Sequence, residues 1–325
     1  MRINHKMENK TILIFGGSGS LGKTIIKRYM DKNQIINFSR DENKHWEMEL
    51  EFKTTKLTNV IGDVKDKEKI IQTLRRFSPT HIIIASALKH IDRCEYDANE
   101  CINTNILGIK NVLDSIETIG CKELETVCFI STDKACSPIN IYGMSKALCE
   151  QMMVEKSRYI RDKKFVVVRY GNVLNSRGSI IPILEQKGKD VNCKEFILTD
   201  ERMTRFVMTL NDSVDLIEYA MVKGESGEIV IPRLGAMRLV DLMAIFSEKY
   251  SKPVKVVGLR VGEKIHESLI NETQAMRSEK RGIYYHIKPT YKVERLGEMF
   301  DYNSSQDVMK VDELKQTLTK NGFLG

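Results

Sequence analysis

Apolar residues in the first half of the chain form short runs separated by longer amphipathic stretches. Runs at 11–15, 34–38, 60–64, 81–85, about 126–130 and 165–169 have the length and the branched residues of buried strands. Helical spacing predicts helices between them, over about 21–30, 67–76 and 99–117, and around Tyr142. Strands that alternate with helices of this length predict parallel βαβ units and therefore an α/β fold.

Beyond residue 169 the apolar runs become shorter and less regular, which indicates a second, smaller part. Residues 1–9 are polar and are predicted to be a flexible lead-in, and 10–170 to form the cofactor-binding domain. Residues 171–199 and 226–325 are predicted to form a smaller α/β substrate-binding lobe, with part of 200–225 returning to the first domain.

A glycine-rich turn follows the first predicted strand. Glycines 16, 19 and 22 stand three residues apart, directly before an amphipathic helix. Such a turn lets the backbone approach a pyrophosphate, and the helix N-terminus supplies N–H donors. The sequence thus predicts a doubly wound sheet of the Rossmann type that binds a nicotinamide dinucleotide; the alternative is a tight loop without a ligand.

The end of the second strand bears on the choice between NADP and NAD. Ser39 and Arg40 favour NADP, because arginine accommodates a 2′-phosphate, whereas Asp41 would suit the ribose hydroxyl of NAD. Asp63 and Val64, at the end of the third strand, are predicted to reach the adenine, unless this is an ordinary strand-end turn.

Candidate chemistry lies just after the strand at 126–130. Thr132, Asp133 and Lys134 follow it, and Tyr142 precedes Lys146 by four residues, so that both lie on one helix face. A nearby ammonium lowers the pKa of a phenol, which could then accept a proton from a sugar hydroxyl. Such a pair also occurs by chance, and Asp133–Lys134 could be a surface ion pair.

Composition and charge restrict the remaining possibilities. The 51 basic and 44 acidic residues are interspersed, so no nucleic-acid-binding stripe is predicted. No apolar stretch is long enough for a membrane span, and no secretory signal is predicted. Seven cysteines without a C-x-x-C pair indicate reduced thiols in the cytoplasm. No metal ligand set is predicted, and His266 is interpreted as structural.

Taken together, eight motifs resemble the extended short-chain dehydrogenase/reductases that act on sugar nucleotides, in particular the UDP-N-acetylglucosamine 4,6-dehydratases of the C5-inverting type. The resemblance runs from about residue 10 to 287. The motifs are those at 16–22, 86–90, 131–134, 142–146, 169–173, 176–179, 199–206 and 260–267. The chain departs from the family at Cys136-Ser137, where Ala-Asn is more common, and at Asp92, where proline is common.

The resemblance implies a homo-oligomeric lyase that uses NADP, acts on a UDP-sugar and needs no metal. Tyr142 and Lys146 would oxidise C4 with the cofactor, Thr132 would bind the C4 oxygen, and Asp133 and Lys134 would serve as acid and base for the loss of water. A base role needs a pKa of Lys134 far below 10. The implied cofactor-binding residues are Gly16, Ser18, Gly19, Ser20, Leu21, Gly22, Ser39, Arg40, Asp63, Val64, Ala85, Ser86, Ala87, Lys89, Tyr142 and Lys146. The implied substrate-binding residues are Lys89, Thr132, Asn172, Arg177, Ser179, Arg205, Arg260 and Glu263.

Other functions on the same fold stay open. A C5-retaining dehydratase is one alternative, although related retaining enzymes often lack a tyrosine at the position of Tyr142, as do some inverting ones. An epimerase or a ketoreductase would need Thr132, Tyr142 and Lys146 but would have no use for an acid–amine pair at 133–134. A nonenzymatic NADP-sensing or scaffold protein is a more remote alternative.

Overall fold

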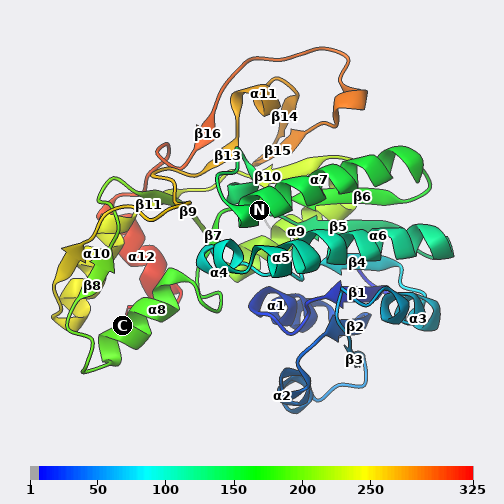
Figure 1. The fold of residues 1–325 in the computed structure, drawn as a ribbon, viewed down its shortest axis with the longest axis horizontal. Helices are drawn as coiled ribbons and strands as arrows, with labels where there is room; N and C mark the ends of the chain where they lie inside the picture. Colours follow the sequence, from blue (N-terminus) through cyan, green and yellow to red (C-terminus); the bar gives the residue numbers. More distant parts are fainter. Residues whose placement is uncertain (1–6, 325) are drawn as a thin grey trace.

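The centre of the molecule is a nine-stranded sheet (Figure 1), seen in a computed structural model that describes residues 7–324. Its strand order is β14-β15-β10-β6-β5-β4-β1-β2-β3. The seven strands from β10 to β3 run parallel, while β15 is antiparallel to both β10 and β14. The bounds are β1 Thr11–Phe15, β2 Gln34–Ser39, β3 Leu57–Ile61, β4 His81–Ile84, β5 Thr126–Ile130, β6 Lys164–Val168, β10 Ile229–Pro232, β14 Ser278–Arg281 and β15 Tyr284–Ile287. The predicted α/β fold of the Rossmann type is confirmed.

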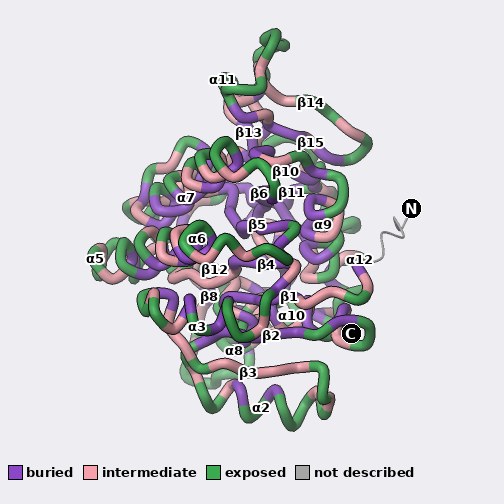
Figure 2. The backbone as a smooth tube through the Cα atoms, turned by 90° about the vertical axis from the view of Figure 1, so that its right-hand side faces the viewer, coloured by how far each residue is buried: buried purple, intermediate pink, exposed green. Residues whose placement is uncertain are grey.

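Helices cover both faces of this sheet. Figure 2 shows buried strands between a layer that contains α3, α6 and α7 on one side and α9 on the other. Helix α1 packs against α9. The helices of this part are α1 Ser20–Tyr29, α2 Glu42–Phe52, α3 Lys67–Phe77, α4 Ile91–Tyr96, α5 Ala98–Cys101, α6 Gly108–Ile119, α7 Ile141–Tyr159 and α9 Leu210–Lys223.

Two predicted elements differ from the structure. The third strand ends at Ile61, so Asp63 and Val64 lie in the turn after it. The helix predicted over 99–117 is interrupted by a π-helical segment, η1 (Ile102–Leu107). There the buried side chain of Asn105 hydrogen-bonds both backbone polar groups of Leu88 (2.8 and 2.9 Å), which ties the segment to the loop after β4.

A second lobe has its own core and lies to one side of the sheet (Figure 1). Phe196, Leu242, Phe246 and Leu314 are among its fully buried residues. Its elements are β7 Asn172–Val173, α8 Ile180–Lys189, β8 Phe196–Leu198, β9 Thr204–Met208, β11 Ala236–Arg238, α10 Leu239–Tyr250, β12 Val254–Val256 and α12 Val311–Lys320. A third small group comprises β13 Ser268–Ile270, α11 Glu272–Ala275, η3 Thr290–Lys292 and β16 Tyr302–Asn303.

The strands do not follow the predicted lobe boundary at residue 226. β10, β14 and β15 come from the region assigned to the substrate lobe, yet they extend the main sheet, because the apolar β10 pairs in parallel with β6. Helix α9, from the segment 200–225, buries Val214 and Ile217 in the main core. Residues 1–6 of the predicted lead-in lie outside the described residues; Met7 is buried, and its carbonyl accepts a hydrogen bond from Asn33.

Candidate active site

The glycine-rich turn joins β1 to α1 and leaves no room for side chains at two points. Gly16 has a φ of +89°, and a Cβ there would lie 2.8 Å from the backbone nitrogen of Ser86. A Cβ at Gly22 would lie 2.4 Å from the backbone of Gly17. Gly19 precedes the helix and has no side-chain cap, so the first N–H groups of α1 face the turn. This backbone forms a cradle that suits a diphosphate.

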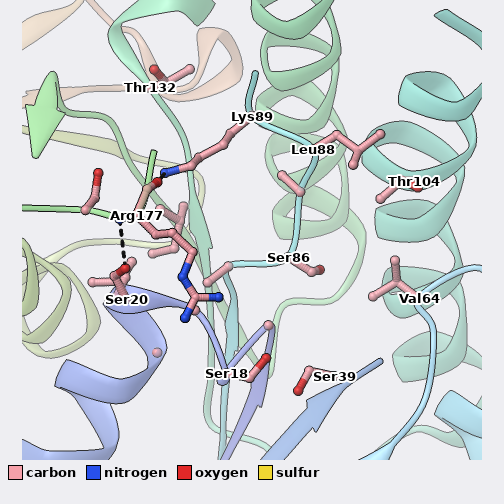
Figure 3. A pocket seen from close by; sticks show the side chains of 18 of the residues that line it. Ser18, Ser20, Ser39, Val64, Ser86, Leu88, Lys89, Thr104, Thr132 and Arg177 are labelled. Carbon is pink, nitrogen blue, oxygen red and sulfur yellow. Dashed lines mark hydrogen bonds between the residues drawn. The ribbon is translucent and has the colours of Figure 1, made fainter. Parts of the chain in front are cut away.

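A cleft of about 710 Å³ opens above this turn, at the carboxyl ends of β1, β2, β4 and β5. All sixteen residues predicted to bind the cofactor line it. Figure 3 shows Ser18 and Ser39 toward one end, Thr132 toward the other, and the side chain of Arg177 between them. The hydroxyl of Ser86 is buried there without a hydrogen-bond partner, as expected where a polar ligand supplies one.

Cationic side chains surround the end of the cleft beside β2. Arg40, half exposed, lies 3.5 Å from Asp63, and Lys44 also lines this end. Asp41 accepts a hydrogen bond from the backbone of Lys44 (3.2 Å) and forms an ion pair with its side chain. The carboxylate that could have bound a ribose hydroxyl therefore serves as the N-cap of α2.

The acid–amine pair lies in a 3-10 turn, η2 (Asp133–Ala135), that follows β5. Asp133 is fully buried, and its Oδ1 accepts from the hydroxyl of Thr132 (2.9 Å) and from Nζ of Lys134 (3.1 Å). Its second oxygen, Oδ2, has no hydrogen-bond partner. The surface-loop interpretation of this pair is wrong. On the other side, Lys134 lies 3.5 Å from the buried carboxylate of Glu267.

These carboxylates determine the protonation of Lys134. Burial acts to lower the pKa of the Lys134 amine, but Asp133 and then Glu267 outweigh it, so that its pKa is raised. The expectation of a pKa far below 10 is therefore wrong, because two anions favour the ammonium form of Lys134.

Tyr142 and Lys146 lie on one face of α7, but they are not paired. Burial raises the pKa of Tyr142 to about 12; Lys134 opposes this effect and Asp133 adds to it. Lys146 donates instead to the carbonyl of Ile130 (2.8 Å), and burial lowers its pKa to about 8. The prediction that Lys146 depresses the Tyr142 pKa is thus wrong in this structure, where the cation that does so is Lys134.

The predicted substrate-binding residues divide into two groups. Lys89, Thr132 and Arg177 line the cleft, and the loop of Arg177 is held across it: the Arg177 backbone accepts a hydrogen bond from Lys89 and donates one to Ser20 Oγ (3.0 Å; Figure 3). Asn172 lies in β7, and the hydroxyl of Ser179, before α8, is buried without a partner.

The other predicted anion contacts lie outside this cleft. Arg205 is buried, and its guanidinium donates to the carbonyls of Thr204, Lys264 and Ile265 at 2.7–3.0 Å. These hydrogen bonds stabilise the backbone around Arg205 and occupy guanidinium donors that could otherwise bind an anion. Arg260 is exposed, and its backbone nitrogen donates to Glu263 (3.3 Å).

Sequence reasoning missed three buried polar residues around the site. Glu150 lies four residues after Lys146, on the same helix face, and accepts two hydrogen bonds from the fully buried Arg169. Its position four residues after Lys146 is a sequence signal that could have identified Glu150. His45, whose ring nitrogen lies 2.6 Å from the Ser39 hydroxyl, carries no local signal. Glu267 ends the motif at 260–267, but only the fold brings it next to the β5 turn, so the motif did not reveal its contact with Lys134.

Two further properties concern the described residues as a whole. Between residues 7 and 324, no helix is both long and apolar enough to cross a membrane. The same residues contain no group of three or more His, Cys, Asp or Glu side chains placed to hold a metal ion.

Comparison with known proteins places this geometry in a family. An inverting UDP-N-acetylglucosamine 4,6-dehydratase of Campylobacter jejuni is 38% identical over 288 residues, covering 87% of this chain and 84% of that protein. A UDP-glucose 4-epimerase of Rickettsia bellii is 40% identical, covering 86% of this chain and 83% of that protein. The X-ray structure of Pen from Bacillus thuringiensis superimposes with a TM-score of 0.89 at 29% identity, covering 98% of this chain and 99% of that one. The family model described as "Polysaccharide biosynthesis protein" matches residues 12–289. The chain therefore belongs to the polysaccharide biosynthesis protein family.

Proposed function

We propose that this protein is a 4,6-dehydratase that acts on UDP-N-acetylglucosamine with a bound NADP. The observation that carries the proposal is the buried Asp133–Lys134 pair, placed beside Thr132 and near Tyr142 at the carboxyl end of β5. Removal of water across two carbons needs both an acid and a base, and this pair supplies both. The Campylobacter jejuni relative named as such a dehydratase supports the same function.

The site fits a nicotinamide dinucleotide, because the cradle at Gly16 and Gly22 and the unpartnered Ser86 hydroxyl line the same cleft as Tyr142. Such a cofactor would accept a hydride from C4 of the sugar and return it to C6. The protein's own part in the oxidation is to receive the proton of the C4 hydroxyl on Tyr142. To receive it, Tyr142 must first be deprotonated: burial raises the pKa of its phenol to about 12, and the Lys134 ammonium acts against this effect. Thr132 would bind the C4 oxygen.

The ketone at C4 makes the neighbouring C5 hydrogen acidic. Lys134, as a neutral amine, would remove it, and Asp133, as a neutral acid, would protonate the C6 oxygen so that water leaves. The ion pair contains the proton needed for both roles: its transfer over the 3.1 Å from Lys134 to Asp133 gives amine and acid together. Exclusion of water by a bound substrate would favour this transfer, since low polarity disfavours two charges.

NADP rather than NAD is favoured by the end of the cleft beside β2. Arg40 and Lys44 offer cations next to Ser39, and Asp41 is engaged as the cap of α2. A 2′-phosphate would meet positive charge there, with no free carboxylate competing for the ribose.

The test is incubation of the purified protein with UDP-N-acetylglucosamine and no added cofactor. A dehydratase returns its hydride within each turnover, so we expect a 4-keto-6-deoxy sugar nucleotide by NMR and mass spectrometry. The Asp133→Asn variant should retain its bound nucleotide and form no product. If wild-type protein gives no dehydrated product, or if Asp133→Asn turns over as fast as wild type, the proposal is refuted.

An epimerase is the second candidate, because the Rickettsia bellii relative carries that name. The same incubation separates the two functions, since an epimerase yields the C4 epimer without loss of 18 mass units. The buried acid–amine pair favours the dehydratase, because C4 epimerisation moves no proton at C5 or C6.

We further propose that configuration at C5 is inverted. Lys134 can remove the C5 proton from one face, and Tyr142, protonated after the oxidation, can deliver one to the other face. The inverting relative supports this assignment. Proton NMR in D₂O, read before slow epimerisation, should show the L-arabino 4-keto sugar; an initial D-xylo product contradicts inversion.

Assembly and location stay predictions. Exposed apolar side chains on α7, Met144 and Leu148, support the expected homo-oligomer. Sedimentation velocity of the purified protein checks it, and a single monomeric species would contradict it. The expected cytoplasmic location can be checked by cell fractionation.

A further inference from the structure

A buried carboxylate from another part of the chain contacts the proposed catalytic lysine. Glu267 lies just before β13, and its Oε1 is 3.5 Å from Nζ of Lys134. Its side chain is 4% exposed, and its Oε2 has no hydrogen-bond partner; the nearest ion-pair contact of that oxygen is Lys264, at 3.9 Å. Two hydrogen bonds with Ser304 fix the main chain of Glu267: its carbonyl accepts from the Ser304 backbone N–H (2.8 Å), and its own N–H donates to the Ser304 hydroxyl (3.0 Å). Burial of a carboxylate without a full set of hydrogen bonds costs free energy, so we expect Glu267 to have a functional role at this position.

The segment 260–267 that ends in Glu267 is held from both lobes. On the side of the main sheet, Asn140 donates to the carbonyl of Gly262 (2.9 Å), and Lys264 donates to the carbonyl of Cys136 (2.8 Å). On the side of the second lobe, Arg205 of β9 donates to the carbonyls of Lys264 and Ile265. Hydrogen bonds thus hold the segment to the turn after β5 on one side and to strand β9 on the other.

The two ends of this segment have different predicted roles. Arg260 and Glu263, at its start, are the residues predicted to bind the nucleotide, while Glu267, at its end, contacts Lys134. Residues predicted to bind the nucleotide and the residue that contacts Lys134 therefore belong to one anchored segment.

We propose that Glu267 is a positioning residue that holds the Lys134 amine in place for proton removal. This inference rests on the proposed dehydratase function. The groups that face the contact are Asp133 and Tyr142 from the main domain, and Arg205 and Lys264 from the opposite side. Burial acts to lower the pKa of Lys134, and Glu267 acts with Asp133 to raise it.

The test compares three variants by pH–rate profile. Glu267→Gln keeps the shape but removes the charge, so the acidic limb of kcat should move about one pH unit lower, and its plateau should fall about tenfold. Glu267→Asp keeps the charge but shortens the reach, so the plateau should fall while the limb stays. KM should change less than kcat in both variants.

Glu228→Gln is the matched control. Glu228 is also a buried carboxylate with one oxygen lacking a hydrogen bond, but it directly precedes β10 and pairs with His286 of the neighbouring strand β15 (2.7 Å). Its loss should lower stability and leave the pH profile unchanged. An acidic limb of Glu267→Gln identical to that of wild type, or an equal shift in Glu228→Gln, would overturn the inference.

A second measurement separates this inference from the proposed function. If wild-type protein forms no dehydrated product, the function fails, but the contact can still be tested by NMR titration of ¹³C-labelled lysine, with Lys134→Arg to assign the signal. The pKa of Lys134 should be lower in Glu267→Gln than in wild type. Equal values in the two proteins refute the inference irrespective of the activity.

Discussion

Replacement of Gly22 by alanine tests whether the glycine-rich turn is built for a cofactor or only for a tight loop. The added Cβ would lie 2.4 Å from Cα and the carbonyl oxygen of Gly17, and both are backbone atoms. No side chain can rotate away, so the turn and α1 must move apart. Overpacking of this kind costs about 1–3 kcal/mol, with the upper end expected for a backbone contact. Alanine regains up to about 1 kcal/mol of helix propensity, which leaves a net loss of about 2 kcal/mol.

Gly19→Ala is the matched variant, because its Cβ would meet only the carbonyl oxygen of Gly16, at 3.4 Å, and would otherwise project into the cleft. We expect Gly22→Ala to lower Tm by about 4 °C in a calorimetric scan, and Gly19→Ala to lower it by less than about half as much. Both should weaken NADPH binding at least about tenfold in a fluorescence titration. A Gly22→Ala protein with wild-type Tm and wild-type NADPH affinity would refute the interpretation of this turn as a cradle for a diphosphate.

Three other substitutions address charge in the site. Lys134→Ala should lower turnover by about 10²–10⁴-fold while bound nucleotide is retained, and turnover within about threefold of wild type would remove its role as base. Arg40→Ala should reverse the preference for NADP(H) over NAD(H), as measured by mass spectrometry of the released nucleotide; mainly NAD in wild-type protein would contradict the assignment. Lys146→Met should abolish activity yet raise ligand-free stability at pH 7 by about 1–2 kcal/mol, because wild-type folding holds a buried ammonium whose pKa is lowered to about 8. Since the unfolded lysine still binds its proton between pH 8 and its ordinary pKa, wild-type stability rises over that range, and the advantage of the variant in urea unfolding should vanish there. Glu150→Gln should cost about 3–5 kcal/mol in the same assay, because it leaves the guanidinium of Arg169 buried without its anion.

The sequence was sufficient for the first six parallel strands of the main sheet, β1 to β6, because they carry a strong local signal. β1, β5 and β6 are short, nearly continuous apolar runs, as strands covered on both faces must be. The glycine spacing located the turn after β1 for a similar reason, since backbone contact at Gly22 excludes every other residue type. Where a single side chain changes the backbone, as Asn105 does in η1, periodicity gave an uninterrupted helix instead.

The membership of β14 and β15 in the main sheet was out of reach for a different reason. β14 reads Ser-Glu-Lys-Arg and contains no apolar residue, because it is an edge strand that pairs only with β15. β14 and β15 form a local hairpin, and this hairpin joins the main sheet through the pairing of β15 with β10, from which an excursion through the second lobe separates it in sequence. Local sequence carries no record of such a pairing.

The protonation states of the site show most clearly what a linear motif leaves out. Spacing on α7 predicted that Lys146 would act on Tyr142, and the base role implied for Lys134 required a low pKa of its amine. In the structure the two lysines exchange these roles: Lys146, facing the Ile130 carbonyl, has the lowered pKa, and Lys134 acts on Tyr142. The difference comes first from Asp133, the neighbour of Lys134 in the motif, and then from Glu267, a second anion that no motif at 131–146 contains. An amine between two carboxylates can become a base only when one of them takes its proton. The chemistry at β5 therefore depends on a residue more than a hundred positions away in sequence.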